Sequence, residues 1–204
     1  MDQQSAQQEL AFVKKVIDDS RKLLIYDGKD MIVWGGLVTL GMLLMFGKFH
    51  LEVGPPVYLT WIVLIGAGWL YSMWRGMKMK NTHRVTTFSG KMMGTIWLAS
   101  GICMTIVGFG FTASGLIAGW AINPVISLFM GLAYFSSATV LGMRYLYVAG
   151  FSWWVAALVM AFWTGPHTFL IFAVLIIAFH IVPGVIFYRK WKREYFHEPA
   201  TVTE

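Results

Sequence analysis

Six long runs of apolar residues decide what this chain can fold into, because each is long enough to cross a lipid bilayer. A helix needs about 20 apolar residues to span a hydrocarbon core about 30 Å thick. Only 13% of the 204 residues are charged, against about 25% in soluble domains. We therefore expect an all-α integral membrane protein with a bundle of six transmembrane helices. The runs cover about 31–47, 56–74, 92–112, 121–142, 147–164 and 167–188.

The chain divides on this basis into three parts. A polar N-terminal region (1–30) precedes the six-helix transmembrane domain (31–190), and a short tail (191–204) follows it. No signal-peptide pattern precedes the first apolar run. We expect the first span to be retained, in a plasma or bacterial inner membrane.

Basic residues gather on one side of the predicted membrane. Of the 16 Lys and Arg residues, only Lys48 falls in the loops at about 48–55, 113–120 and 164–167. Cytoplasmic loops of membrane proteins are enriched in Lys and Arg, so the pattern predicts that both termini are cytoplasmic. It also accounts for the net charge of +6 without a nucleic-acid partner.

The N-terminal region has the pattern of a cytoplasmic amphipathic helix about 20 residues long. Ser5 and Gln8 have capping-box spacing. Apolar residues then recur at three- and four-residue steps, among them Leu10, Val13, Ile17 and Leu24. Such a stripe must be buried against the membrane surface, the bundle itself, a second copy or a protein partner.

A weak internal repeat suggests that the spans form three related helical hairpins. The first two hairpins share a Gly-Lys pair before a tryptophan, and a Gly-Met pair followed by a basic residue at their ends. All three would begin and end on the cytoplasmic side, as parallel repeats do in some transporters. The hairpins cover about 28–80, 88–146 and 148–193.

Glycine, proline and asparagine mark two of the predicted turns. Gly165-Pro166 indicates a turn between the fifth and sixth spans. Asn123-Pro124 has the residue types that cap and begin a helix. We therefore expect Asn123 to cap the fourth span.

One ionisable residue, His180, lies deep inside a predicted span. It precedes Arg189 by about nine residues, or about 13 Å along a helix, which places it near the bilayer midplane. An ionisable side chain at that depth is a candidate functional site. His180, Pro183 and Gly184 are therefore candidates for a ligand or proton site beside a helix kink.

The same residues also have a structural interpretation. Pro183 has no N–H, so the carbonyl of Phe179 loses its α-helical partner. In hydrocarbon that carbonyl must find another donor, either the imidazole of His180 or a group on a facing helix.

Metal or haem binding would require distant residues to meet. His50, Glu52 and His167 lie in predicted outer turns and could bind zinc or another transition metal if the first and third hairpins turn close together. A haem ligated by His180 would need a methionine as second ligand, because no other histidine lies at its depth. The methionines that could approach are Met104, Met130 and Met160.

A basic connection follows the second span and suits anionic lipid headgroups, although a cytoplasmic location alone also explains it. Its cations are Arg75, Lys78, Lys80, Arg84 and Lys91.

Chemically reactive groups are scarce. No Asp or Glu occurs between Glu52 and Glu194, whereas ion-coupled carriers often place carboxylates inside the membrane. Most hydrolases need paired carboxylates, a metal or an activated nucleophile. The one cysteine, Cys103, permits no intrachain disulfide.

By elimination we expect a non-enzymatic multi-pass membrane protein, with no particular cofactor indicated. It would act as an accessory, sensory or scaffold subunit, in contact with the lipid bilayer, and would meet a protein partner or a second copy through its cytoplasmic face. One alternative is a small transporter or channel with its site near the kink at His180 and Pro183. The other is a haem- or metal-binding membrane protein.

Overall fold

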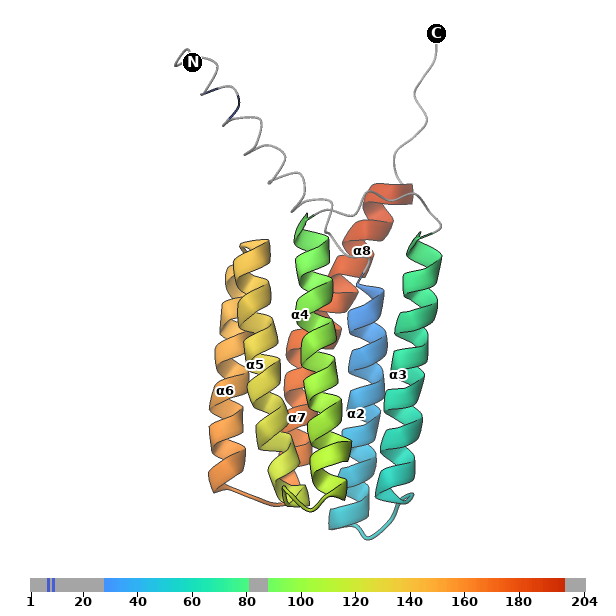
Figure 1. Ribbon diagram of the computed structural model, residues 1–204, viewed down its shortest axis with the longest axis vertical. Coiled ribbons are helices and arrows are strands. Elements are labelled where there is room, and N and C mark those ends of the chain that lie inside the picture. Colours follow the sequence, from blue (N-terminus) through green and yellow to red (C-terminus); the bar gives the residue numbers. More distant parts are fainter. Residues whose placement is uncertain (1–6, 8, 10–27, 81–87, 197–204) are drawn as a thin grey trace.

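The computed structural model describes residues 7, 9, 28–80 and 88–196. These residues contain six helices that are long and apolar enough to span a membrane, and no β-strand lies among them (Figure 1). These helices coincide with the six apolar runs, so the expected all-α fold with six helices long enough to span a membrane is confirmed for this part of the chain. The predicted amphipathic helix, with Leu10, Val13, Ile17 and Leu24, lies outside the described residues.

Three helical hairpins follow one another along the chain. The first consists of α2 (Lys29–His50) and α3 (Val57–Lys80). The second consists of α4 (Phe88–Thr105), its π-helical continuation (Ile106–Phe111), a 3-10 turn (Gly119–Ala121) and α5 (Ile122–Leu141). The third consists of α6 (Arg144–Phe162) and a last span built from α7 (His167–Ile176), a π-helical turn (Ile177–Ile181) and α8 (Val182–Phe196).

Positive charge is concentrated at one end of the bundle, which we call the basic end. The starts of α2, α4 and α6 and the ends of α3, α5 and α8 all lie there (Figure 1). Among the described residues, every Lys and Arg except Lys48 belongs to this end. The charge asymmetry is therefore a property of the fold, and its cytoplasmic orientation stays a prediction.

The basic connection between the second and third spans is shorter than the sequence pattern indicated. Helix α3 continues to Lys80 and α4 begins at Phe88, so Arg75, Lys78, Lys80 and Lys91 lie on helices rather than in a loop. The apolar pattern indicates only the residues expected to cross the hydrocarbon core. The helices themselves continue past the ends of these apolar runs. Arg84 lies outside the described residues.

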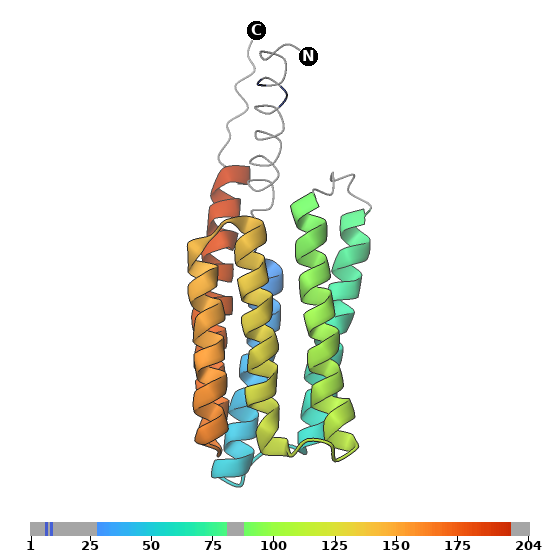
Figure 2. The ribbon, with the colours of Figure 1, turned by 60° about the vertical axis from the view of Figure 1, so that its left-hand side comes forward.

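Close approach of small residues holds the bundle together. At the contact between α5 and α6, a Cβ added to Gly150 would lie 3.0 Å from the carbonyl oxygen of Gly131. Helices in lipid associate chiefly through such close packing. Around this contact lies a core that includes Trp153, Tyr134 and Phe172, all almost fully buried. Helix α3 lies at the edge of the bundle, packed on α2, and its span is the least buried (Figure 2).

Candidate functional site

Four helical segments meet at a buried cluster of Trp97, Tyr134 and His180. Trp97 comes from α4, Tyr134 from α5 and His180 from the π-helical turn of the last span. Ring centroids lie 5.3 Å apart for Trp97 and Tyr134, and 5.4 Å apart for Trp97 and His180. Helix α2 closes the cluster with Gly35, where an added Cβ would lie 3.5 Å from His180 Cδ2. Only 7% of His180 and 1% of Tyr134 are exposed.

The cluster lies closer to the middle of the helices than to their basic ends. Gly35 is six residues after Lys29, where α2 begins, and Tyr134 is seven residues before Leu141, where α5 ends. At 1.5 Å per residue, both are about 10 Å from the basic end of their helices. Counting about 13 Å from Arg189 along the last span gives a similar depth for His180, and its place near the bilayer midplane stays a prediction.

Tyr134 supplies a donor to the last span where Pro183 interrupts its helical hydrogen bonding. Its hydroxyl donates a hydrogen bond to the carbonyl oxygen of Phe179 over 2.9 Å, and this is the carbonyl that Pro183 cannot serve. The same hydroxyl oxygen pairs with Nδ1 of His180. Because the tyrosine has one proton and a carbonyl can only accept, Nδ1 must carry the hydrogen of the second bond. Tyr134 therefore fixes the orientation of the imidazole as well as the carbonyl.

Pro183 and Gly184 occupy the first turn of α8, and both are buried. Just before them, the N–H of Val182 bonds to the carbonyl of Ile177, a π-helical pairing over five residues. Gly184 packs backbone to backbone against Gly28 at the start of α2. A Cβ added to Gly28 would collide with the Gly184 carbonyl. Gly184 thus has a packing role at the basic end.

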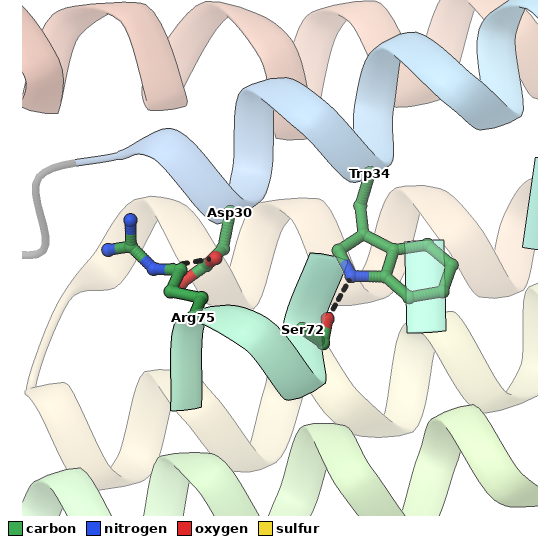
Figure 3. A network of polar contacts seen from close by, with 4 residues as sticks. All are labelled: Asp30, Trp34, Ser72 and Arg75. Carbon is green, nitrogen blue, oxygen red and sulfur yellow. Dashed lines mark hydrogen bonds and ion pairs between the residues drawn. The ribbon is translucent and has the colours of Figure 1, made fainter. Parts of the chain in front are cut away.

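Two polar contacts join α2 to α3 (Figure 3). Arg75 Nε lies 2.9 Å from a carboxylate oxygen of Asp30. One turn further along, the indole N–H of Trp34 donates to the hydroxyl of Ser72 over 2.9 Å. The Arg75 side chain is only 15% exposed and pairs with Asp30, and its contact with a lipid headgroup stays a prediction. Spacing along the sequence gave no signal for this pairing.

The other predicted headgroup contacts have mixed environments. Lys78 and Lys91 are exposed at the basic end, and the Lys78 ammonium lies 5.3 Å from the ring centroid of Trp74. The side chain of Lys80 lies outside the part of the structure that is described. Lys78 and Lys91 are exposed where the membrane boundary is expected, and their binding of lipid headgroups stays a prediction.

The predicted metal ligands lie at the opposite end of the bundle. Stacking of Phe49 on Phe169, with centroids 5.7 Å apart, brings the first and third hairpins together there. His167, however, stacks on Trp163 at 4.0 Å and bonds its carbonyl oxygen, and His50 stacks on Phe46 at 4.8 Å. Within residues 28–80 and 88–196 no group of three His, Cys, Asp or Glu side chains could hold a metal. The structure therefore does not assemble His50, Glu52 and His167 into a site.

The methionines considered as haem ligands belong to the apolar core. Met130 and Met160 are buried within it and Met104 packs against it. Nδ1 of His180 forms a hydrogen bond with Tyr134. The observed contacts of the cluster therefore join helices to one another.

A second buried polar contact, which the sequence did not indicate, joins α5 to α7. The Asn123 amide donates to the hydroxyl of Thr168 over 3.1 Å, and that hydroxyl donates to the carbonyl of Gly165 over 2.8 Å. The prediction that Asn123 caps the fourth span is wrong. Ala121 precedes α5, without a side-chain cap bond, and Asn123 is buried because it faces α7.

The chain matches no protein-family model, no curated protein and no solved structure. Its own geometry is therefore the basis for a functional proposal. Between residues 31 and 193 the only carboxylate is Glu52, in the turn after α2, and Asp30 at the start of α2 pairs with Arg75.

Proposed function

We propose that this chain is a non-enzymatic membrane subunit, with an accessory, sensory or scaffold role, that binds a protein partner through its basic end. The observation that carries the proposal is a set of exposed cations on the described part of that end. They are Lys78, Lys91, Arg144, Arg189, Lys190, Lys192 and Arg193. Cations clustered on one surface favour a partner with an acidic surface.

The position of α8 supports this role. Helix α8 extends beyond the other helices at the basic end in both views (Figures 1 and 2). Arg189, Lys192 and Arg193 are exposed on this projecting segment. Contact between the rings of Tyr145 and Phe187, 6.4 Å apart, packs α8 beside the start of α6. With Lys190, four exposed cations on one projecting helix form a compact docking surface.

The interior of the bundle supports a non-transport role. The hydroxyl of Tyr134 is engaged by Phe179 and His180, and the amide of Asn123 is engaged by Thr168. Polar groups that already bond to each other would lose those bonds by binding a passing solute. The buried polar residues are thus explained by helix joining.

Site-specific photocrosslinking tests the proposal in the native cell. A photoreactive amino acid at Lys192 should label one protein partner, and the same amino acid at Lys48, at the opposite end, should not. Replacing both Arg189 and Arg193 with Glu should reduce the labelling from position 192. Labelling of lipid alone from position 192, or equal protein labelling from both positions, would contradict the proposal.

A small transporter or channel is the second candidate. Its support is the pair of π-helical turns inside spans, Ile106–Phe111 and Ile177–Ile181, because such turns are frequent at functional sites. Uptake of small neutral solutes by proteoliposomes, reduced by Pro183→Ala, would favour this candidate over the subunit role.

A further inference from the structure

Both halves of the last span pack on α2, and each half has further contacts of its own. Helix α7 is anchored in the interior by Thr168, which accepts from Asn123 at 3.1 Å, and by Phe172, whose ring lies 4.7 Å from that of Trp153. Helix α8 is held at the basic end instead, where Gly184 meets Gly28 and Lys29 lies 5.2 Å from the ring centroid of Trp191. The contacts beyond α2 therefore differ between the two halves.

The joint between these halves lacks regular helical bonding. Pro183 cannot donate to the carbonyl of Phe179, and the π-helical turn from Ile177 to Ile181 replaces α-helical pairing. Sharp changes in helix direction occur at proline and at π-bulges. Both features coincide at Phe179–Pro183.

A single side chain from another helix bridges this joint. The hydroxyl of Tyr134 on α5 holds the Phe179 carbonyl at 2.9 Å and also bonds His180. Trp97 packs edge-on against Tyr134, which limits movement of the phenol ring. If this bond opened, the Phe179 carbonyl would lose its side-chain donor, while Trp97 and α2 would still pack against the joint.

We propose that the last span is a hinged helix in which Tyr134 is the latch. The hinge is Phe179–Pro183, α7 is the fixed arm, and α8 is the arm that changes its angle. Movement of α8 would separate Gly184 from Gly28 and shift the cations of the basic end. The device thus links the buried cluster around His180 to the exposed surface at the basic end, and it does not depend on the identity of any partner.

Distance measurements between spin labels test the hinge in the full chain reconstituted in lipid nanodiscs. Cys103 is the only cysteine, so Cys103→Ser gives a background for labelling. One pair, at exposed positions Val148 on α6 and Lys192 on α8, reports the moving arm. The control pair, at exposed positions Val155 on α6 and Val174 on α7, reports the fixed arm.

Tyr134→Phe should broaden the distance distribution of the moving arm and leave that of the fixed arm unchanged. We expect the population of displaced α8 to rise about fivefold, the shift that corresponds to the loss of one hydrogen bond. Tyr147→Phe, which removes a hydroxyl that contacts Thr139 outside the cluster, should change neither distribution.

Adding Pro183→Ala to Tyr134→Phe makes the test independent of how well the single variant folds. Alanine restores an N–H that can bond Phe179, so the double variant should return the moving-arm distribution to its original width. Equal broadening of both pairs in Tyr134→Phe, no broadening of either, or a double variant as broad as the single one would overturn the proposal.

Discussion

The hydroxyl of Tyr134 on α5 donates to the carbonyl oxygen of Phe179 on the last span, 2.9 Å away. This is the carbonyl that loses its helical partner because Pro183 has no N–H. The Phe179 carbonyl would otherwise lack a hydrogen-bond donor among apolar side chains, and a neighbouring helix supplies one. The same hydroxyl also bonds Nδ1 of His180, so Tyr134 joins two hairpins and orients the imidazole.

Tyr134→Phe should destabilise the bundle by about 1 kcal/mol, since interhelical hydrogen bonds in membranes average about 0.6 kcal/mol and reach about 1.7 kcal/mol. The ring is retained, so packing on Trp97 should change little. Unfolding by a denaturing detergent, followed by circular dichroism, measures the loss. Tyr147→Phe is the matched control, and an equal loss in both variants would argue against a special role for Tyr134.

His180→Asn should be tolerated better than His180→Gln. The asparagine amide reaches roughly the position of Nδ1, the atom that bonds Tyr134, whereas the glutamine amide reaches roughly that of Nε2. Loss of one buried hydrogen bond costs about 1 kcal/mol, which sets the expected difference in the free energy of unfolding. Gln as stable as Asn would mean that the bond to Tyr134 contributes little.

Gly28→Ala should destabilise the basic end by about 1–3 kcal/mol, the cost of a residue held in a strained backbone conformation. Gly28 has φ of +67°, and an added Cβ would collide with the Gly184 carbonyl. Gly36→Ala is the control, because open space surrounds Gly36 on the same helix and alanine favours helix. The thermal midpoint of the purified protein should fall for the first variant and hold or rise for the second.

Asp30→Asn should weaken the attachment of α3 to α2. It leaves Arg75, whose side chain is 15% exposed, without its charged partner, at a cost of about 1–3 kcal/mol for a hydrogen bond to a charged group. Proteolysis in the α3–α4 connection should become faster, since α3 is packed chiefly on α2. Ser72→Ala, which removes only the neutral bond from Trp34, should have a smaller effect.

Much of the architecture follows from residue patterns alone. Apolar run length locates all six spans, because bilayer thickness fixes how many residues a helix needs to cross it. The distribution of Lys and Arg locates the basic end. Pro183 predicts both a kink in the last span and the loss of the helical hydrogen bond to the Phe179 carbonyl.

The partners of those residues could not be predicted, because they depend on which helix faces which. Nothing in the sequence assigns Tyr134, 45 residues away from Phe179, as the donor. Asn123 beside a proline looks like a helix cap, but it is buried against Thr168. Asp30 and Arg75 lie at the ends of an antiparallel helix pair, so their contact requires the hairpin itself.

Native mass spectrometry of the chain released gently from its own membrane tests the central claim most directly. Three forms should be compared: the natural sequence, a double variant with Arg189→Glu and Arg193→Glu, and the control Lys48→Glu at the opposite end. Our account predicts a stoichiometric protein partner on the natural sequence and on the control, and its loss from the double variant. A bare monomer or homo-oligomer carrying only lipid in all three forms would contradict the subunit role.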